Sequence, residues 1–182
     1  MKSKFIIATA ALLVMVSTAV YSVESVDSEL APSAEEFFDV SFGDLTEELN
    51  LVREEDKTGV LIMFESKDCP WCHRMKLNVL NRVAVQDYFH KNFRILSLDA
   101  EGDLLITDFD GKEVTSKEFA LKAMRVRATP VFAFYDKEGE LVTRYTGALK
   151  NAHDFLLLGQ FVVDGHYKSS RFSKFRRENQ PS

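Results

Sequence analysis

The sequence of 182 residues is poor in cysteine, proline and glycine, and it lacks an excess of basic residues. Two cysteines allow one disulfide at most, and four prolines with eight glycines argue against long disordered linkers in the middle of the chain. The formal net charge of −5 gives no indication of nucleic-acid binding, which needs a basic face. The hydrophobic content, by contrast, is 46%, which is enough to fill the core of one domain.

The longest apolar stretch lies at the N-terminus, between residues 5 and 20, after Lys2 and Lys4. A positive start, an apolar core and small residues near its end are typical of an export signal, which we place at residues 1–22. The stretch also approaches the length of a membrane span, so it is either cleaved or retained as an N-terminal anchor. Both outcomes predict a periplasmic or otherwise exported protein, in a compartment where disulfides persist.

Both cysteines lie in one motif, residues 67–73 (Lys-Asp-Cys-Pro-Trp-Cys-His), which closely follows the apolar run 59–64. Three chemistries use a Cys-x-x-Cys pair: a dithiol/disulfide redox centre, a covalent haem attachment and half of a zinc site. A purely structural disulfide fits poorly, because it would close a very small loop and remove little entropy from the unfolded chain. The rest of the sequence has to separate these alternatives.

The haem alternative rests on His73, because Cys-x-x-Cys-His is the haem-attachment pattern. It requires a second iron ligand; Met75 is too close in the sequence, which leaves Met124. The zinc alternative is weaker, because the four histidines are scattered and no second ligand pair has the spacing of a metal site. Covalent haem also leaves the strand predicted before the motif unexplained.

The remaining segments predict alternating helices and strands. Residues 23–39 are largely polar and acidic, and we interpret them as a spacer. The patterns then predict a helix from Asp44, a strand over 59–65, a helix beginning at the cysteine motif, a strand over 93–98, a hairpin around Asp110-Gly111, a short helix opened by Thr115 and Glu118, strands over 131–135 and 141–145, and a helix capped by Asn151. The basic tail, residues 166–182, is either a frayed, solvated end or a patch for anionic lipid or an acidic partner.

This order of elements resembles the thioredoxin-like superfamily and is most similar to exported or periplasmic thioredoxins of the sulfur-oxidation (SoxW) type. Three segments carry the resemblance: residues 64–73 with the two cysteines, residues 107–111 (Thr-Asp-Phe-Asp-Gly) and residues 126–132 (Val-Arg-Ala-Thr-Pro-Val-Phe). The resemblance covers residues 40–165, the predicted domain. It implies an α/β thioredoxin fold, with a central mixed sheet flanked by helices, an N-terminal helix and a small hairpin insertion.

The resemblance also implies how the cysteines act. Cys69 would lie at the start of a helix, where unpaired N–H groups and the helix dipole favour a thiolate, and is expected to attack a disulfide. Cys72, one turn further along and more buried, is expected to resolve the mixed disulfide.

Four further residues are expected to position the substrate. Pro70 holds the turn at the start of the helix, and Trp71 offers an exposed apolar surface beside Cys69. Pro130 is expected to follow a cis peptide bond, so that Thr129 presents backbone polar groups to an extended substrate segment.

One departure concerns the proton acceptor of the second cysteine. Many thioredoxins carry a buried aspartate six residues before the first cysteine, where this sequence has Met63; Glu65, on the same strand face, is the candidate substitute. Asp68, if close, would raise the pKa of the Cys69 thiol, and a protonated His73 would lower it. The sequence leaves the sum of these two effects open.

The sequence thus predicts an exported thiol–disulfide oxidoreductase that reduces disulfides in partner proteins. The resemblance implies a membrane electron donor of the DsbD/CcdA kind and no separate cofactor beyond the Cys69–Cys72 disulfide, and we expect a monomer that does not bind nucleic acid. The alternatives are a c-type haem protein and a redox-inactive binding module that uses the fold as a peptide platform.

Overall fold

The computed structural model describes residues 29–123 and 125–180. The predicted signal segment, the beginning of the predicted spacer and the candidate haem ligand Met124 lie outside the described residues. None of the helices within the described ranges has the length and hydropathy of a membrane span.

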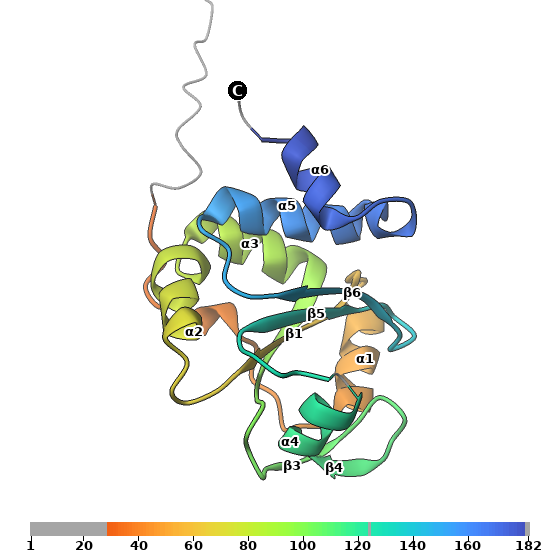
Figure 1. Ribbon diagram of the computed structural model, residues 1–182. Helices are drawn as coiled ribbons and strands as arrows, with labels where there is room; N and C mark the ends of the chain where they lie inside the picture. The colour runs from red at the N-terminus through yellow and green to blue at the C-terminus, as the bar shows by residue number, and fades with distance from the viewer. Residues whose placement is uncertain (1–28, 124, 181–182) are drawn as a thin grey trace, which may run out of the picture.

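A four-stranded mixed sheet forms the centre of the molecule, in the order β2-β1-β5-β6 (Figure 1). Strand β1 (Gly59–Glu65) pairs in parallel with β2 (Phe93–Asp99) and antiparallel with β5 (Val131–Tyr135), which pairs antiparallel with β6 (Leu141–Thr146). Because β1 is an inner strand, its residues 59–64 are all buried. The continuous apolar run predicts this placement, since a strand covered on both faces does not need alternating polar residues.

Helices cover both faces of this sheet (Figure 1). One face carries α1 (Leu45–Glu54) and α4 (Ser116–Glu118), which continues as a π-helical turn (Phe119–Ala123). The other carries α2 (Pro70–Met75), which continues as a π-helical turn (Lys76–Leu80), together with α3 (Val83–Asn92) and α5 (Ala152–Val163). The observed architecture confirms the predicted thioredoxin fold.

Side chains of β1 alternate between the two resulting cores. Leu61 and Met63 belong to the core under α2, α3 and α5, whereas Val60, Ile62 and Phe64 belong to the core under α1. Successive side chains of a strand point to opposite faces, so the last residue of β1 follows Met63 onto the α2 side. The strand therefore delivers one side chain to the region below the cysteine motif.

The predicted hairpin insertion is present between β2 and α4. It consists of β3 (Leu105–Thr107) and β4 (Glu113–Thr115), which form a separate two-stranded antiparallel sheet. Thr115 and Glu118 form the predicted capping box, in which each side chain bonds the other residue's backbone N–H.

Residues 29–39 belong to the folded unit and are not a separate spacer. The Phe37 side chain, in a 3₁₀ turn (Glu35–Phe37), is fully buried against the rings of Phe89 and Phe155. The Asp39 carboxylate accepts a hydrogen bond of 2.7 Å from the Ile95 N–H. The acidic composition predicted a spacer, but the apolar side chain and these tertiary contacts fix the segment, so the folded unit begins before residue 40.

The segment after residue 165 is also folded, and the prediction of a frayed end is wrong for its described residues. It contains a 3₁₀ turn (His166–Lys168) and helix α6 (Phe172–Glu178). The rings of Phe172 and Phe175 lie 5.6 and 5.5 Å from that of Phe161 on α5. Two aromatic side chains among the basic ones therefore attach this segment to the domain.

Candidate active site

Cys69 and Cys72 form a disulfide at the start of α2. Cys69 is the N-cap residue, and its sulfur accepts a hydrogen bond of 3.0 Å from the Cys72 N–H, one of the donors that a helix start leaves unpaired. Pro70 fits the first helical position because its missing N–H is not needed there. Cys69 is 8% exposed and Cys72 2%, so the first sulfur lies nearer to solvent, as expected.

The Thr129–Pro130 peptide bond is cis, which confirms the expectation for this loop. Pro130 is buried and its carbonyl accepts a hydrogen bond of 2.9 Å from the Gly147 N–H, while Thr129 is partly exposed. Ser66 connects the loop to the disulfide: its hydroxyl lies 3.2 Å from the Thr129 hydroxyl, and its carbonyl accepts from the Cys69 N–H at 3.2 Å. The cis-proline loop and the first cysteine are thus held by the same residue.

Trp71 is exposed to solvent over 55% of its surface, although the next residue, Cys72, is buried. The Arg74 guanidinium lies 5.6 Å from the centre of its ring, one helical turn away, and orients the indole by a cation–π contact. An exposed tryptophan beside the reachable sulfur gives the site a flat apolar surface.

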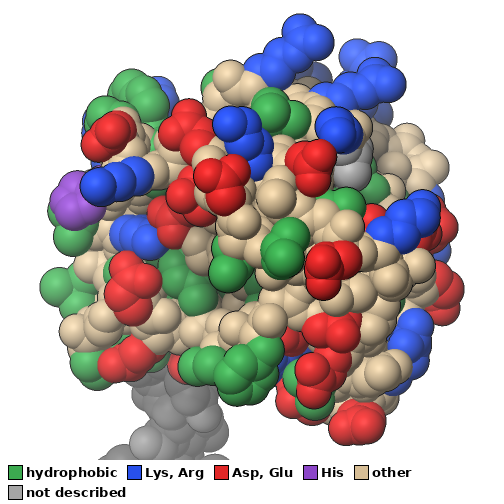
Figure 2. Space-filling view, turned by 90° about the horizontal axis from the view of Figure 1, so that it is seen from below, with side chains coloured by type: hydrophobic (Ala, Val, Ile, Leu, Met, Phe, Trp, Pro, Cys, Tyr) green, Lys and Arg blue, Asp and Glu red, His purple; other side chains and the backbone are tan. Residues whose placement is uncertain are grey.

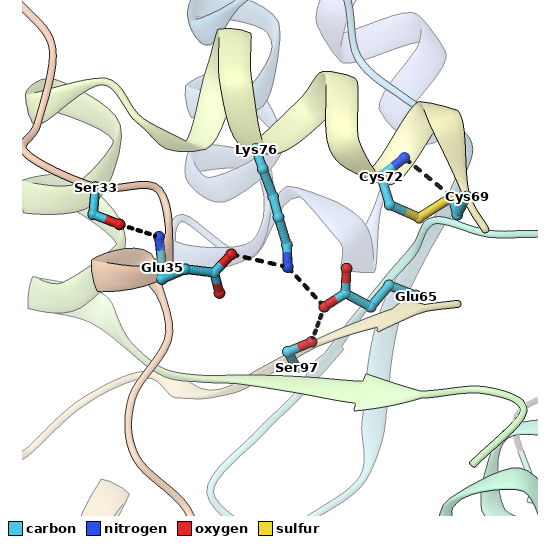
Figure 3. Close-up of polar contacts among 7 residues, drawn as sticks. All are labelled: Ser33, Glu35, Glu65, Cys69, Cys72, Lys76 and Ser97. Atoms are coloured by element: carbon cyan, nitrogen blue, oxygen red, sulfur yellow. Dashed lines mark hydrogen bonds and ion pairs between the residues drawn. A yellow bond between two sulfur atoms is a disulfide. The ribbon is translucent and has the colours of Figure 1, made fainter. Parts of the chain in front are cut away.

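Glu65 lies at the end of β1 and forms a polar cluster behind the disulfide (Figure 3). Its carboxylate accepts hydrogen bonds from the Ser97 hydroxyl and, at 2.9 Å, from the Lys76 ammonium. The same ammonium lies 3.3 Å from the Glu35 carboxylate. A hollow next to the disulfide is lined by both cysteines and by Glu65 and Lys76, so this cluster borders the sulfurs.

The Lys76 ammonium is partly removed from water in this cluster. Burial alone lowers the pKa of Lys76, but the hydrogen bond and charge of Glu65, with Glu35, outweigh it and raise the pKa above the ordinary value. Lys76 therefore stays charged at neutral pH and holds the Glu65 carboxylate in place beside the hollow.

Met63 occupies the strand position where many thioredoxins have an aspartate. It is fully buried and is flanked in the sheet by Ser97 on β2 and Phe132 on β5. A charge there would lack a partner in an apolar core. The carboxylate nearest to the cysteines on this strand is instead Glu65, two residues further along the same face.

The sequence predicted Glu65 as part of the site but missed the other members of its cluster: Lys76 and Ser97, which bond Glu65 directly, and Glu35, which pairs with Lys76. Lys76 lies four residues after Cys72, hence on the same side of the helix, and this spacing could have indicated it. Ser97 and Glu35 come from β2 and from the N-terminal 3₁₀ turn, and only the tertiary structure brings them together.

Asp68 and His73, the two other pKa-tuning candidates, are both exposed. His73 lines the hollow beside the disulfide, whereas Asp68 does not. Neither forms an ion pair with any described residue. The structure therefore brings His73, but not Asp68, to the hollow that the two cysteines line.

Two observations bear on the haem and zinc alternatives. Met75 is fully buried, and its sulfur accepts a hydrogen bond of 3.2 Å from the Leu149 N–H, so it is engaged in the core. Within the ranges described, no three His, Cys, Asp or Glu side chains are grouped so as to hold a metal ion.

A disulfide at a helix start, joined through Ser66 to a cis-proline loop on a four-stranded mixed sheet, defines a thiol–disulfide oxidoreductase of the thioredoxin fold. The chain belongs to the thioredoxin-like domain family, whose model matches residues 45–162. A comparison with curated proteins found no match.

Solved structures share this fold. A thioredoxin-fold protein from Helicobacter pylori superposes with a TM-score of 0.60 at 19% identity, over 80% of this chain and 92% of that one. A putative disulphide-isomerase from Bacteroides thetaiotaomicron gives 0.52 at 26% identity, over 70% and 92%. A thioredoxin from Thermus thermophilus gives 0.51 at 25% identity, over 64% and 82%.

Proposed function

We propose that this chain is an exported protein-disulfide reductase, with Cys69 as the attacking and Cys72 as the resolving cysteine. The observation that carries the assignment is the asymmetry of the pair: Cys69 is the more exposed, and its sulfur accepts the N–H that would stabilise a thiolate. The similarity to a putative disulphide-isomerase from Bacteroides thetaiotaomicron agrees with chemistry on protein disulfides.

The reaction proceeds in two exchanges. The Cys69 thiolate attacks one sulfur of the client disulfide, forms a mixed disulfide and expels the other client sulfur as a thiolate. Cys72 then loses its proton, attacks the Cys69 sulfur and expels the second client thiolate, which closes the Cys69–Cys72 disulfide. Two electrons pass from the dithiol to the client, and the two client thiolates take up protons.

Glu65 is the group proposed to receive the proton of Cys72. It lines the same hollow as both cysteines, and Lys76 keeps it near them. A carboxylate within reach of a thiol acts as a general base.

Trp71, Thr129 and Pro130 form the proposed client-binding edge. The exposed indole provides apolar contact area, and the loop around the cis bond offers backbone groups that pair with an extended client segment as an added strand does. Pro70 shapes the turn that exposes Cys69.

Export, electron supply and clients complete the proposal. The N-terminal sequence pattern supports transfer out of the cytoplasm into the periplasm or an equivalent compartment. A membrane protein of the DsbD/CcdA kind would return two electrons to the disulfide after each turnover, and no other cofactor is required. Sulfur-carrier proteins or apocytochromes are the proposed clients.

The test combines a redox titration with trapping of clients. In glutathione buffers, a reductase is expected near the thioredoxin end of the scale, about −270 mV, and a value near about −120 mV would make the protein an oxidant instead. The Cys72→Ser variant is expected to accumulate mixed disulfides with client proteins, with the double serine variant as the blank. Equal trapping by Cys69→Ser would contradict the assigned roles. A Soret band in the absorption spectrum would favour haem.

A further inference from the structure

Helix α6 presents three cationic side chains around one hollow. Arg171, Lys174 and Arg177 are all exposed and recur every three residues, which places them on one side of the helix. The hollow is otherwise lined only by neutral groups: Tyr167, Ser169, Ser170 and Ser173. Among the described residues the one acidic neighbour within ion-pair range of the three is Glu178, which lies 3.9 Å from Lys174.

The opposite side of α6 is fixed to the domain. Phe172 and Phe175 pack on α5, and the Asp154 carboxylate lies 3.8 Å from the Arg176 guanidinium and accepts 2.7 Å from the Gln180 side chain. The helix therefore holds the three cations in place. Because its aromatic side chains are engaged in packing, they are not available to enter an apolar phase.

The positive charge of this segment contrasts with the negative charge of the rest of the protein. Residues 166–182 contain five basic residues and one acidic residue, so this segment carries +4 while the chain as a whole carries −5 and residues 1–165 carry −9. Acidic side chains are spread over the face that lies on the other side of the molecule from α6, with basic ones among them (Figure 2). An anionic surface would attract the α6 side and repel most of the remainder.

We propose that the Arg171/Lys174/Arg177 face binds the anionic headgroups of a phospholipid membrane. Clustered lysine and arginine side chains are attracted to anionic lipid surfaces, and serine and tyrosine hydroxyls can donate to phosphate oxygens. The apolar residues 5–20 are expected to bring the chain to a membrane, which makes a bilayer the anionic surface that fits this face. Binding is electrostatic, without insertion of the helix, because Phe172 and Phe175 face the protein.

The position of α6 gives this binding a consequence for orientation. In Figure 1, α6 lies on the outer side of α5, away from the start of α2 where the disulfide forms. A molecule held by α6 therefore keeps its cysteine pair open to proteins approaching from another side.

The experiment measures sedimentation of the full chain with neutral phosphatidylcholine vesicles and with vesicles containing phosphatidylglycerol. The ratio of the two affinities is the readout, since the apolar N-terminal segment contributes to both. We expect at least a tenfold preference for anionic vesicles, lost at high salt. The variant R171Q/K174Q/R177Q is expected to lose this preference, because each removed charge lowers the affinity for an anionic surface by up to about fivefold.

The matched control, K112Q/K117Q/K122Q, removes three exposed cations from the hairpin and α4 region and is expected to keep the preference. An unchanged preference in the α6 variant, or equal losses in both variants, would overturn the proposal. A wild-type chain that ignores anionic vesicles but binds polyglutamate would overturn it too and assign the face to acidic proteins. Disulfide reduction by both variants should match the wild type, so this result is independent of the proposed reductase function.

Discussion

The Nζ atom of Lys76 lies 2.9 Å from Oε1 of Glu65, and this ion pair joins the active-site helix to the end of the central strand. It borders the hollow that contains both sulfurs. The pair thus places a carboxylate near the resolving cysteine in a protein whose strand has methionine at the usual aspartate position.

Replacing Glu65 by glutamine is expected to slow the second exchange. Without the carboxylate, Cys72 loses its general base, and general-base catalysis contributes on the order of 10² in rate. The lifetime of a mixed disulfide with a model peptide, followed at pH 7 by mass spectrometry after acid quench, should lengthen accordingly. Above the ordinary thiol pKa of about 8.5 the difference should vanish, because Cys72 then ionises unaided. A purely structural effect would slow the reaction equally at every pH.

Replacing Lys76 by methionine is expected to lower the free energy of unfolding by about 1–2 kcal/mol at pH 7, because Glu65 loses a charged hydrogen-bond donor. The pKa of Lys76 is raised in the folded protein, so its contribution is fully present below the unfolded value of about 10.5 and is lost as the pH rises through the folded value. Urea unfolding of both proteins from pH 7 to 11 should show the difference shrinking at the alkaline end. A constant difference would mean that packing alone is responsible.

Gly59 is expected to tolerate no side chain. A Cβ atom at this position would lie 1.8 Å from the Tyr135 carbonyl oxygen, at the end of strand β5. Because backbone lies on both sides of this contact, Gly59→Ala should cost about 3 kcal/mol or more, or prevent folding. Gly111→Ala is the control: it has open space but a φ of +76°, and it should cost about 1 kcal/mol. Urea denaturation of the two variants compares the cost of a steric clash with the cost of backbone strain. If both variants lost the same free energy of unfolding, the clash at Gly59 would not be the explanation.

Truncating the aromatic residues of α6 is expected to destabilise the protein. Phe172 and Phe175 are partly buried, so Phe172→Ala and Phe175→Ala should each lower the free energy of unfolding by about 2 kcal/mol, less than a fully buried phenylalanine. Phe42→Ala, at a side chain that is 93% exposed, should change it by less than about 0.5 kcal/mol. Thermal unfolding and limited proteolysis near residue 171 provide the measurements. If α6 did not pack on the domain, all three variants would have the same free energy of unfolding as the wild type.

Local signals allowed much of the fold to be predicted from the sequence. The observed bounds of β1 match the prediction, because a buried inner strand has a continuous apolar run between turn-forming residues. The helix starts at Asp44 and Asn151 were also predicted, since each cap is a bond between a side chain and a backbone N–H a few residues ahead.

The two ends and the polar cluster could not be predicted in the same way. Phe37 and Phe175 lie in charged segments, and their burial depends on surfaces of α3 and α5 that are distant in the sequence. The two partners of Glu65 likewise come from β2 and from the π-helical turn after α2, and the N-terminal 3₁₀ turn adds Glu35 as a second partner of Lys76. No local sequence pattern predicts these contacts between distant residues, because they depend on how the helices and strands pack together.

The contacts of Ser66 affect how the active site responds when peripheral elements such as α6 unfold locally. Its carbonyl holds the Cys69 N–H, and its hydroxyl lies 3.2 Å from that of Thr129, so the nucleophile and the client-binding edge share one anchor at the end of the inner strand. Fraying of α6 or of the hairpin insertion leaves this anchor untouched. The redox centre therefore keeps its geometry for as long as β1 and β5 stay paired, and thermal inactivation should follow melting of the sheet and not the earlier opening of the periphery.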